Sequence, residues 1–266
     1  MDLKPPNSVA IMQPYFIPYL GYFSLMASVE RFVVYGQVQH RRKSWFTRNR
    51  LKIDNQVRLM SPPVLAAPSN SLIANIRISL EPEWRRVMLA QIRHSYGRTP
   101  FFEETWPLVE SILSNPNDSL YAFNLFGLKS IAAHLGITTE ILSDANVHPG
   151  IEAHAYDQPD SERRRNARVV SICVGLNAKS YVNPESGRHL YDARYFLGSG
   201  VGLWFSSPEI DAVKSALGDA SADLSILHVL MHHGQAKTYN CLNLARLTQA
   251  QATTAARQQI SEGAKD

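Results

Sequence analysis

The chain has 266 residues, of which 45% are hydrophobic, so it can bury a substantial core and is not disordered. Its 27 Lys and Arg residues against 23 Asp and Glu residues give a net charge of only +4, too small to favour nucleic acid as the partner. The N-terminus has no apolar signal segment and no stretch reaches about 18 consecutive apolar residues. We therefore expect neither secretion nor a membrane span.

The two cysteines, Cys173 and Cys241, lie far apart and in no metal-binding spacing. This usage is typical of a reduced, cytoplasmic protein without a structural metal.

The first third of the chain predicts a strand, loop, helix and strand. Residues 8–12 form a buried strand, residues 18–29 a helix with Pro18 in its first turn, and residues 31–35 a second strand. Such a unit favours a parallel α/β sheet with ligands at the carboxyl ends of the strands. A hairpin is then expected from 45–53 and 56–60, a proline-rich loop over 61–70, and a further strand over 73–80.

The middle of the chain is helical and the second half alternates again. Helices are predicted over 81–96, 101–113 and 119–135, the last ended by Gly136. The later elements are strands at 138–142, 180–183 and 201–205, helices at 161–176 and 190–197, and a polar stretch beyond residue 247. We predict an α/β fold with a mostly parallel sheet and a helical middle segment, as a single domain over 1–250 followed by a polar tail, 251–266. If the domain is divided into two lobes, we expect their boundary within the polar segment 143–160.

Aromatic, amide and guanidinium groups concentrate in two blocks near the N-terminus. In the first, Pro14 and Pro18 stiffen a loop before a helix, and Gln13, Tyr15 and Tyr22 are predicted to face a ligand. The second block is rich in Arg and Lys and also contains Trp45 and Asn49. Guanidinium groups bind phosphate or carboxylate and a Trp face stacks on a sugar or base, as a nucleotide-linked sugar would require. The substrate-binding candidates outside the first block are Tyr35, Gln39, Arg42, Trp45, Asn49, Arg50 and Tyr96.

Each block also has a structural reading. The first block contains the core face of a helix, and the second resembles a charged edge hairpin that prevents aggregation.

Two residues are predicted to act in catalysis. His94 lies near the end of a predicted helix, where the helix dipole tunes it as a general base, and Asp192 could orient a base or bind a sugar hydroxyl. Their structural alternatives are a helix C-terminal cap for His94 and a helix N-terminal cap for Asp192.

Three other features favour structural interpretations. His228 and His232 share a helix face, but no Glu lies between them and Gly234 stops the helix, so metal binding is disfavoured. The arginines at 163–165 open a helix and are interpreted as a solvated face, with phosphate contact second. Cys173 reads as a core residue, and a cysteine nucleophile is a minority hypothesis.

Several long motifs occur in one order along the chain. They are Gln13-Pro14-Tyr15-Phe16-x-Pro18-Tyr19-x-Gly21-Tyr22-Phe23, Val38-Gln39 with Trp45 and Arg48-Asn49-Arg50, His94-Ser95-Tyr96 with Pro100-Phe101-Phe102, and Tyr181, Gly187, Tyr191-Asp192 and Phe196. In these motifs the chain resembles the WbqC-like family of bacterial proteins. The resemblance implies a role in building surface polysaccharides or related glycans.

Two adjacent positions depart from the family pattern. Gly36 and Gln37 stand where members of the family usually carry a pair of aspartates before Val-Gln. Loss of a metal-binding or basic carboxylate pair and a harmless change at a strand end are equally compatible with the sequence.

Taken with the resemblance, the residues predict an enzyme that transfers an acyl or aminoacyl group to an amino sugar or nucleotide-linked sugar. A thioester donor would make a metal or other cofactor unnecessary, and an acyl-carrier protein is the expected partner besides the small-molecule sugar. The alternatives are a non-catalytic protein that binds glycans or nucleotide sugars, and a nucleotidyl or adenylate-forming transferase.

Overall fold

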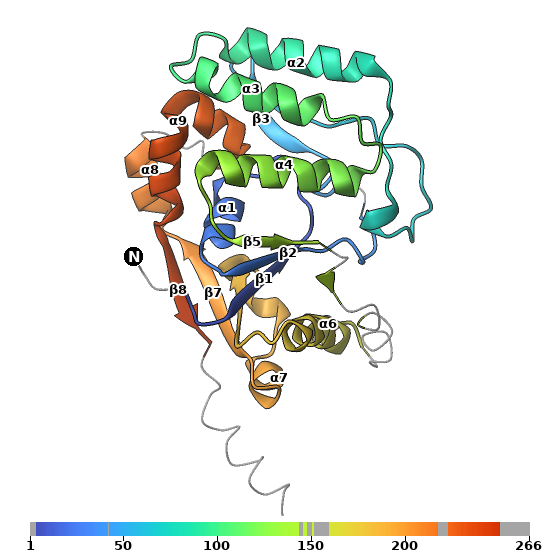
Figure 1. Cartoon of the computed structure of the whole chain (residues 1–266), viewed down its shortest axis with the longest axis vertical. Coiled ribbons are helices and arrows are strands. Elements are labelled where there is room, and N and C mark those ends of the chain that lie inside the picture. The colour runs from blue at the N-terminus through green and yellow to red at the C-terminus, as the bar shows by residue number, and fades with distance from the viewer. Residues whose placement is uncertain are drawn as a thin grey trace, which may run out of the picture.

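A six-stranded sheet forms the centre of the molecule (Figure 1). The computed structural model describes residues 4–41, 43–143, 146–147, 151, 160–217 and 223–250. The strands, in spatial order, are β5 (Glu140–Leu142), β2 (Arg31–Val34), β1 (Ser8–Met12), β6 (Ser180–Pro184), β7 (Gly202–Pro208) and β8 (Ala245–Gln249). All neighbours are parallel except β7 and β8. The predicted α/β fold with a mostly parallel sheet is confirmed.

Both faces of this sheet are buried, as expected for parallel strands. Successive residues point to opposite faces, so Val9, Val33 and Tyr181 enter one core cluster and Ala10 and Phe32 enter the other. Helices α6 (Ser161–Gly175) and α7 (Ala193–Gly198) cover the first face, and α1 (Leu20–Ala27) and α9 (Ile226–Leu242) cover the second.

The predicted helical middle segment stacks beyond the second face (Figure 1). It consists of α2 (Pro82–Tyr96), α3 (Phe102–Leu113) and α4 (Leu120–Leu135), each starting within one residue of its predicted position. Gly136 has a φ of 74° and ends α4 in the left-handed conformation, as expected for a C-terminal glycine. Within the described residues, no helix is long and apolar enough to span a bilayer.

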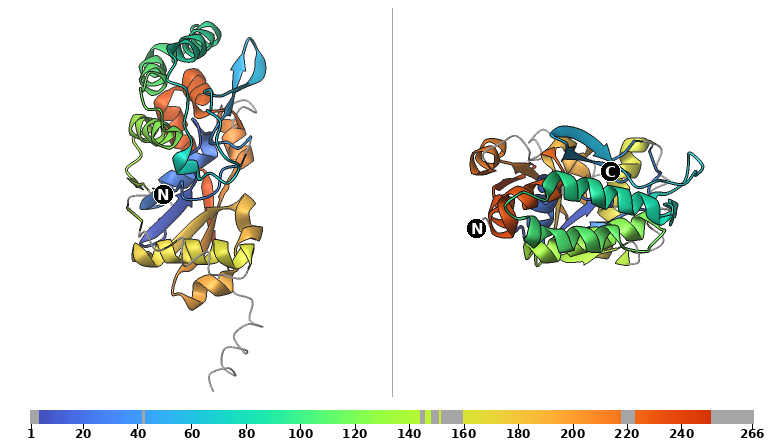
Figure 2. Two further views of the ribbon diagram at one scale, coloured as in Figure 1. Left: turned by 90° about the vertical axis from the view of Figure 1, so that its right-hand side faces the viewer. Right: turned by 90° about the horizontal axis from the view of Figure 1, so that it is seen from above.

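The predicted hairpin forms a separate two-stranded antiparallel sheet of β3 (Asn49–Ile53) and β4 (Gln56–Met60). Asp54 and Asn55 both have positive φ angles, 50° and 61°, as a tight hairpin turn requires. Figure 2 shows the hairpin standing at the side of the helical layer. The first strand is shorter than predicted, because residues 44–47 form a turn closed by the bond from Thr47 N to Ser44 O.

The strand predicted over 73–80 is wrong. Residues 73–75 form a short 3-10 helix, η1 (Ile73–Asn75), whose amides bond to the loop after β2, for example Ala74 N to Gly36 O at 3.0 Å. Ile73, Ile76 and Ile78 are buried, so the apolar pattern reflects packing of an irregular segment and not a sheet strand.

Boundaries elsewhere differ in three places. The helix predicted from residue 18 starts at Leu20, because the carbonyl of Pro18 accepts a bond from Ile226 N. The helix predicted over 190–197 starts later, as α7 at Ala193, and a 3-10 helix, η3 (Glu185–Leu190), precedes it. Thr248 and Gln249, expected in the polar stretch beyond residue 247, belong to β8, and α8 (Ile210–Leu217) was not expected. The tail 251–266 and most of 143–160 lie outside the described residues.

The strand order indicates the edge of the sheet at which a ligand is expected to bind. From β1 the chain proceeds through α1 to β2 on one side, while β6 lies on the other side of β1. The carboxyl ends of β1 and β6 therefore form the topological switch point, where doubly wound sheets bind ligands.

Candidate functional site

Two pockets lie at this edge of the sheet, and the loop after β1 contributes to both. The first, which we name the aromatic pocket, has a volume of about 350 Å³ and is lined by Tyr15, Tyr19, Trp45, Asn49, Arg50, Ser186 and Asp223. The second, the arginine pocket, has a volume of about 620 Å³ and includes Gln13, Tyr35, Gln39, Arg41, Arg164, Arg165, Arg168 and Tyr191 in its lining. Gln13 lines the arginine pocket and Tyr15, two residues later, lines the aromatic pocket, so the two pockets meet along this loop.

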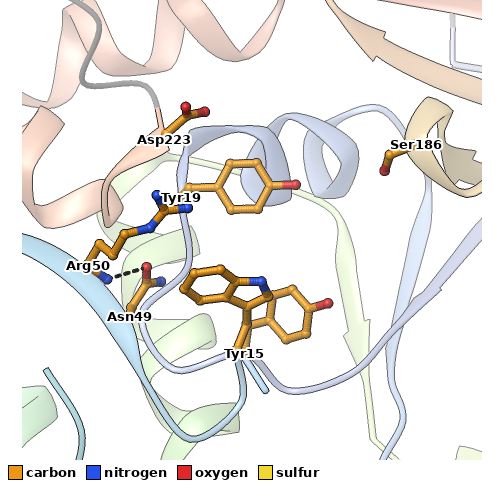
Figure 3. A pocket seen from close by; sticks show the side chains of 7 residues that line it. Tyr15, Tyr19, Asn49, Arg50, Ser186 and Asp223 are labelled. Carbon is orange, nitrogen blue, oxygen red and sulfur yellow. Dashed lines mark hydrogen bonds between the residues drawn. The ribbon is translucent and has the colours of Figure 1, made fainter. Parts of the chain in front are cut away.

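The aromatic pocket combines flat rings with charged groups. Figure 3 shows Tyr15 and Tyr19 facing the same space, with Arg50 and Asp223 on one side and Ser186 across from them. The Arg50 guanidinium carbon lies 5.0 Å from the centroid of the Trp45 ring, a cation–π distance. The Nε of Arg50 is buried and has no hydrogen-bond partner in the described part of the chain.

Burial keeps the tyrosine hydroxyls of this pocket protonated. It raises the pKa of Tyr15 and of Tyr19 above the usual value, and the nearby charge of Asp223 raises the pKa of Tyr19 further. At neutral pH both hydroxyls are therefore neutral groups that can donate and accept hydrogen bonds.

The loop of residues 13–19 is fixed by buried polar side chains from distant elements. Asn49 Nδ2 donates to Phe16 O at 3.0 Å and to Ile17 O at 2.7 Å, and Ser225 Oγ donates to Ile17 O at 2.9 Å. Asn124 Nδ2, from α4, donates to Pro14 O at 2.7 Å. The loop is thus held from β3, α4 and the start of α9, so its tyrosines are positioned before any ligand arrives.

Tyr22 is placed behind this loop and not in a pocket. Its side chain is 1% exposed, and its hydroxyl donates to Gln13 O at 2.8 Å. The prediction that Tyr22 faces a ligand conflicts with this burial. The α1 face buries the ring, and the residue instead positions Gln13.

The two predicted catalytic residues are not brought together. The His94 side chain is 81% exposed on α2, with its Nε2 3.8 Å from Asp54 Oδ1 in the hairpin turn, and it lines neither pocket. Asp192 caps α7 by accepting from Arg194 N at 2.9 Å and forms an ion pair with the Arg194 side chain. The Arg194 side chain lowers the pKa of the Asp192 carboxyl, as a paired helix cap requires.

Tyr96 and His228 of α9 are buried behind the hairpin, and the half-buried His232 lies beside them. The Tyr96 hydroxyl accepts from Lys52 N at 3.0 Å and lies 3.0 Å from His228 Nδ1. The rings of His228 and His232 are 4.5 Å apart. In the described residues, no three His, Cys, Asp or Glu side chains are grouped so that they could hold a metal ion. Tyr96, predicted to bind substrate, is 2% exposed and lines neither pocket.

The other substrate-binding candidates divide between the two pockets. Tyr15, Trp45, Asn49 and Arg50 line the aromatic pocket, Gln13, Tyr35 and Gln39 line the arginine pocket, and Arg42 lies outside the described residues. The sequence interpretation assigned no ligand role to Ser186 or Asp223, and it placed Arg164 and Arg165 on a solvated face. Asp223 belongs to none of the sequence motifs described above, so no local pattern identified it as a ligand-binding residue. The arginine run at 163–165 was a usable signal, since two of its residues, Arg164 and Arg165, line the arginine pocket.

The comparisons with known proteins agree with the motifs. The model of the WbqC-like protein family matches residues 13–240. The uncharacterized protein Rv1507c of Mycobacterium tuberculosis is 26% identical over 233 residues, covering 86% of this chain and 94% of that protein. No solved structure matches this chain.

Proposed function

Since the chain belongs to the WbqC-like protein family, we propose that it is an enzyme of bacterial glycan assembly, such as surface polysaccharide of the O-antigen type. In this proposal it transfers an acyl or aminoacyl group to an amino sugar, free or linked to a nucleotide. The proposed compartment is the cytoplasm, in keeping with the two buried free thiols.

The lining of the aromatic pocket is the observation that supports this function most. Tyr15, Tyr19 and Trp45 offer ring faces on which a sugar ring can stack. Asp223 and Arg50 offer charged groups for hydroxyl and amino substituents. A volume of about 350 Å³ is at the small end of ligand pockets, which suits one sugar unit.

Asp223 has the position that the proposed reaction requires of a general base. It is the one carboxylate among the described residues that line the aromatic pocket. In the proposed step, its carboxylate takes a proton from the sugar ammonium, and the freed amine attacks the carbonyl carbon of a thioester. The C–N bond forms, the C–S bond breaks, and the second proton lost by the nitrogen passes to the sulfur, so that the thiol leaves on its carrier. The hydroxyl of Tyr19 and the guanidinium of Arg50 can donate to the oxyanion that develops.

This assignment competes with His94, the base expected from the sequence. His94 lies on the outer helix α2, is largely exposed and contacts the hairpin turn. We therefore propose Asp223 as the general base, and a pair of variants distinguishes Asp223 from His94.

Transfer assays with thioester donors and amino sugars test the catalytic assignment. Asp223→Asn loses the charge but keeps a hydrogen-bonding side chain, so it should weaken sugar binding only modestly and lower turnover by about 100-fold or more, the usual contribution of general base catalysis. His94→Ala, the control, should retain turnover. Normal turnover by Asp223→Asn together with its loss in His94→Ala would return the role to His94.

Sugar binding is tested separately by calorimetry. Trp45→Ala should weaken amino-sugar binding about tenfold by removing a stacking face, and Trp45→Phe should restore much of it. The ring is 37% exposed and its backbone carbonyl still accepts from Phe16 N, so the fold should survive. Absence of amino-sugar binding by the wild-type protein would refute the proposal, and binding without turnover would favour the non-catalytic alternative.

Strand order supports a second candidate function. A doubly wound sheet with its switch point between β1 and β6 is a frequent nucleotide-binding arrangement. Release of pyrophosphate that depends on a nucleotide and Mg²⁺ would identify a nucleotidyl or adenylate-forming transferase instead.

A further inference from the structure

The arginine pocket has no role in the sugar chemistry proposed above, and we infer that it binds the diphosphate group of a substrate. The inference rests on the proposed function for its context, because a nucleotide-linked sugar and a coenzyme A thioester both carry a diphosphate. The shared chemistry of these two sources is what the pocket would recognise.

Charge is the first argument for an anion. Arg41, Arg164, Arg165 and Arg168 line the pocket, and its described lining contains no Asp or Glu. The three arginines of α6 are half-buried. Guanidinium groups bind phosphate oxygens through charge-assisted hydrogen bonds, so a lining of this composition suits a phosphate-bearing anion.

The geometry of α6 directs these groups to one place. Arg164 and Arg168 are four residues apart and so share a helix face, with Arg165 beside them. Arg165 Nη1 donates to Leu190 O at 2.9 Å, a contact that orients the guanidinium without neutralising it. Arg165, Arg168 and Tyr191 line the same pocket; burial raises the pKa of Tyr191, and the two arginine charges partly oppose that rise.

The remaining lining suits the groups attached to a diphosphate. Gln13 and Gln39 supply amides and Tyr35 a ring, from the segments that follow β1 and β2. Arg41 comes from the second of these segments and makes no hydrogen bond or ion pair within the described residues. The pocket thus faces the carboxyl ends of two parallel strands, where phosphates commonly bind.

The two pockets are related through the loop after β1. Gln13 lines the arginine pocket, Tyr15 lines the aromatic pocket, and Tyr15 N bonds to Gln13 O at 2.9 Å. A substrate with its diphosphate in the arginine pocket and its sugar or acyl group in the aromatic pocket would lie across the turn at residues 13–15.

Calorimetry with full-length protein tests the inference. The probes are inorganic pyrophosphate, uridine diphosphate and coenzyme A. Arg168→Gln and Arg41→Gln should each weaken pyrophosphate binding about tenfold or more, because each removes a charge-assisted contact. The matched control is Arg163→Gln on the same helix. The Arg163 side chain is 64% exposed, pairs with Asp160 at 3.6 Å and is not part of the lining, so binding should be unchanged.

Each outcome is decisive. Uridine diphosphate binding with the same arginine dependence identifies a nucleotide-linked sugar as the source, and coenzyme A binding identifies the thioester donor. No binding of any probe, or equal loss in Arg163→Gln, overturns the inference. Melting curves of all variants verify that they fold.

The result is separable from that of the proposed function. Trp45→Ala should leave pyrophosphate binding intact. If the protein binds pyrophosphate through its arginines but binds no amino sugar, the anion site is supported and the acyl transfer is refuted. If it binds amino sugars but not pyrophosphate, the anion site is refuted and the proposed function is unaffected.

Discussion

At the scale of single residues, the main feature is the conformation of Ile17. Its φ is 39°, in the left-handed region that β-branched residues avoid. Such a conformation costs about 1–3 kcal/mol and persists only where the surroundings enforce it. Here the carbonyl of Ile17 accepts from Asn49 Nδ2 and from Ser225 Oγ. The strain therefore lies in the loop that carries Tyr15 and Tyr19 into the aromatic pocket.

Asn49→Ala should destabilise the protein by about 1–3 kcal/mol, because the Phe16 carbonyl loses its side-chain donor and the Ile17 carbonyl keeps only one. The effect is measured by urea unfolding. Lys52→Ala on the same strand, where the side chain is exposed, should change stability by less than about 0.5 kcal/mol. Equal stability of the two variants would mean that Asn49 does not hold the loop.

At the scale of elements, α9 is two helices joined at a glycine. Gly234 has a φ of 73° and a ψ of 173°, a conformation open essentially to glycine alone. A Cβ there would lie 2.5 Å from Phe101 Cδ1. The predicted helix stop at Gly234 is thus a real break, but the chain resumes as a helix to Leu242 and then pairs as β8. This break directs the second half of α9 back to the sheet edge.

Gly234→Ala should cost about 1–3 kcal/mol of stability through backbone strain, with the clash against Phe101 in addition. The matched control is Gly175→Ala at the end of α6, where an added Cβ meets nothing within 4 Å. That variant should be neutral or more stable by up to about 1 kcal/mol. Thermal unfolding of the pair measures the difference, and similar melting temperatures would contradict the strain argument.

At the scale of the whole molecule, Tyr96 joins three elements that are distant in sequence. It extends from α2, accepts from Lys52 N in β3 and meets His228 of α9. The helical layer, the hairpin and the sheet-covering helix are therefore linked at one hydroxyl. Burial raises its pKa from the usual value near 10 to about 12.

This shift makes stability depend on alkaline pH. Between pH 10 and about 12 the unfolded chain releases the Tyr96 proton while the native state keeps it, so the free energy of unfolding falls as pH rises. The contribution is complete below pH 10 and is lost as pH passes the folded pKa, at up to about 1.4 kcal/mol per pH unit. Tyr96→Phe should be less stable at pH 7, and its stability should fall less steeply above pH 10. Urea titrations across this range measure both, and an unchanged slope would refute the assignment.

The sequence by itself determined most of the helices and strands, through its apolar patterns and through the residues that end helices and form turns. Short, largely apolar runs located the five parallel strands, and Gly136 marked the end of α4, because these patterns depend on local geometry. The strand predicted over 73–80 failed because alternate burial there arises from packing against loops, which sequence spacing does not distinguish from a sheet. The residues of the two N-terminal blocks were also identified as polar and aromatic groups suited to a ligand.

Only the tertiary structure decided how those groups are used. It divided the blocks between two pockets, buried Tyr22 and Tyr96, and brought Asp223 and Ser186 to the residues of the first block. It also turned the arginines of α6 toward the ends of β1 and β2. These contacts join segments more than 100 residues apart. Strand order and helix packing create them, and a chain read locally carries no signal of which distant residue will complete a pocket.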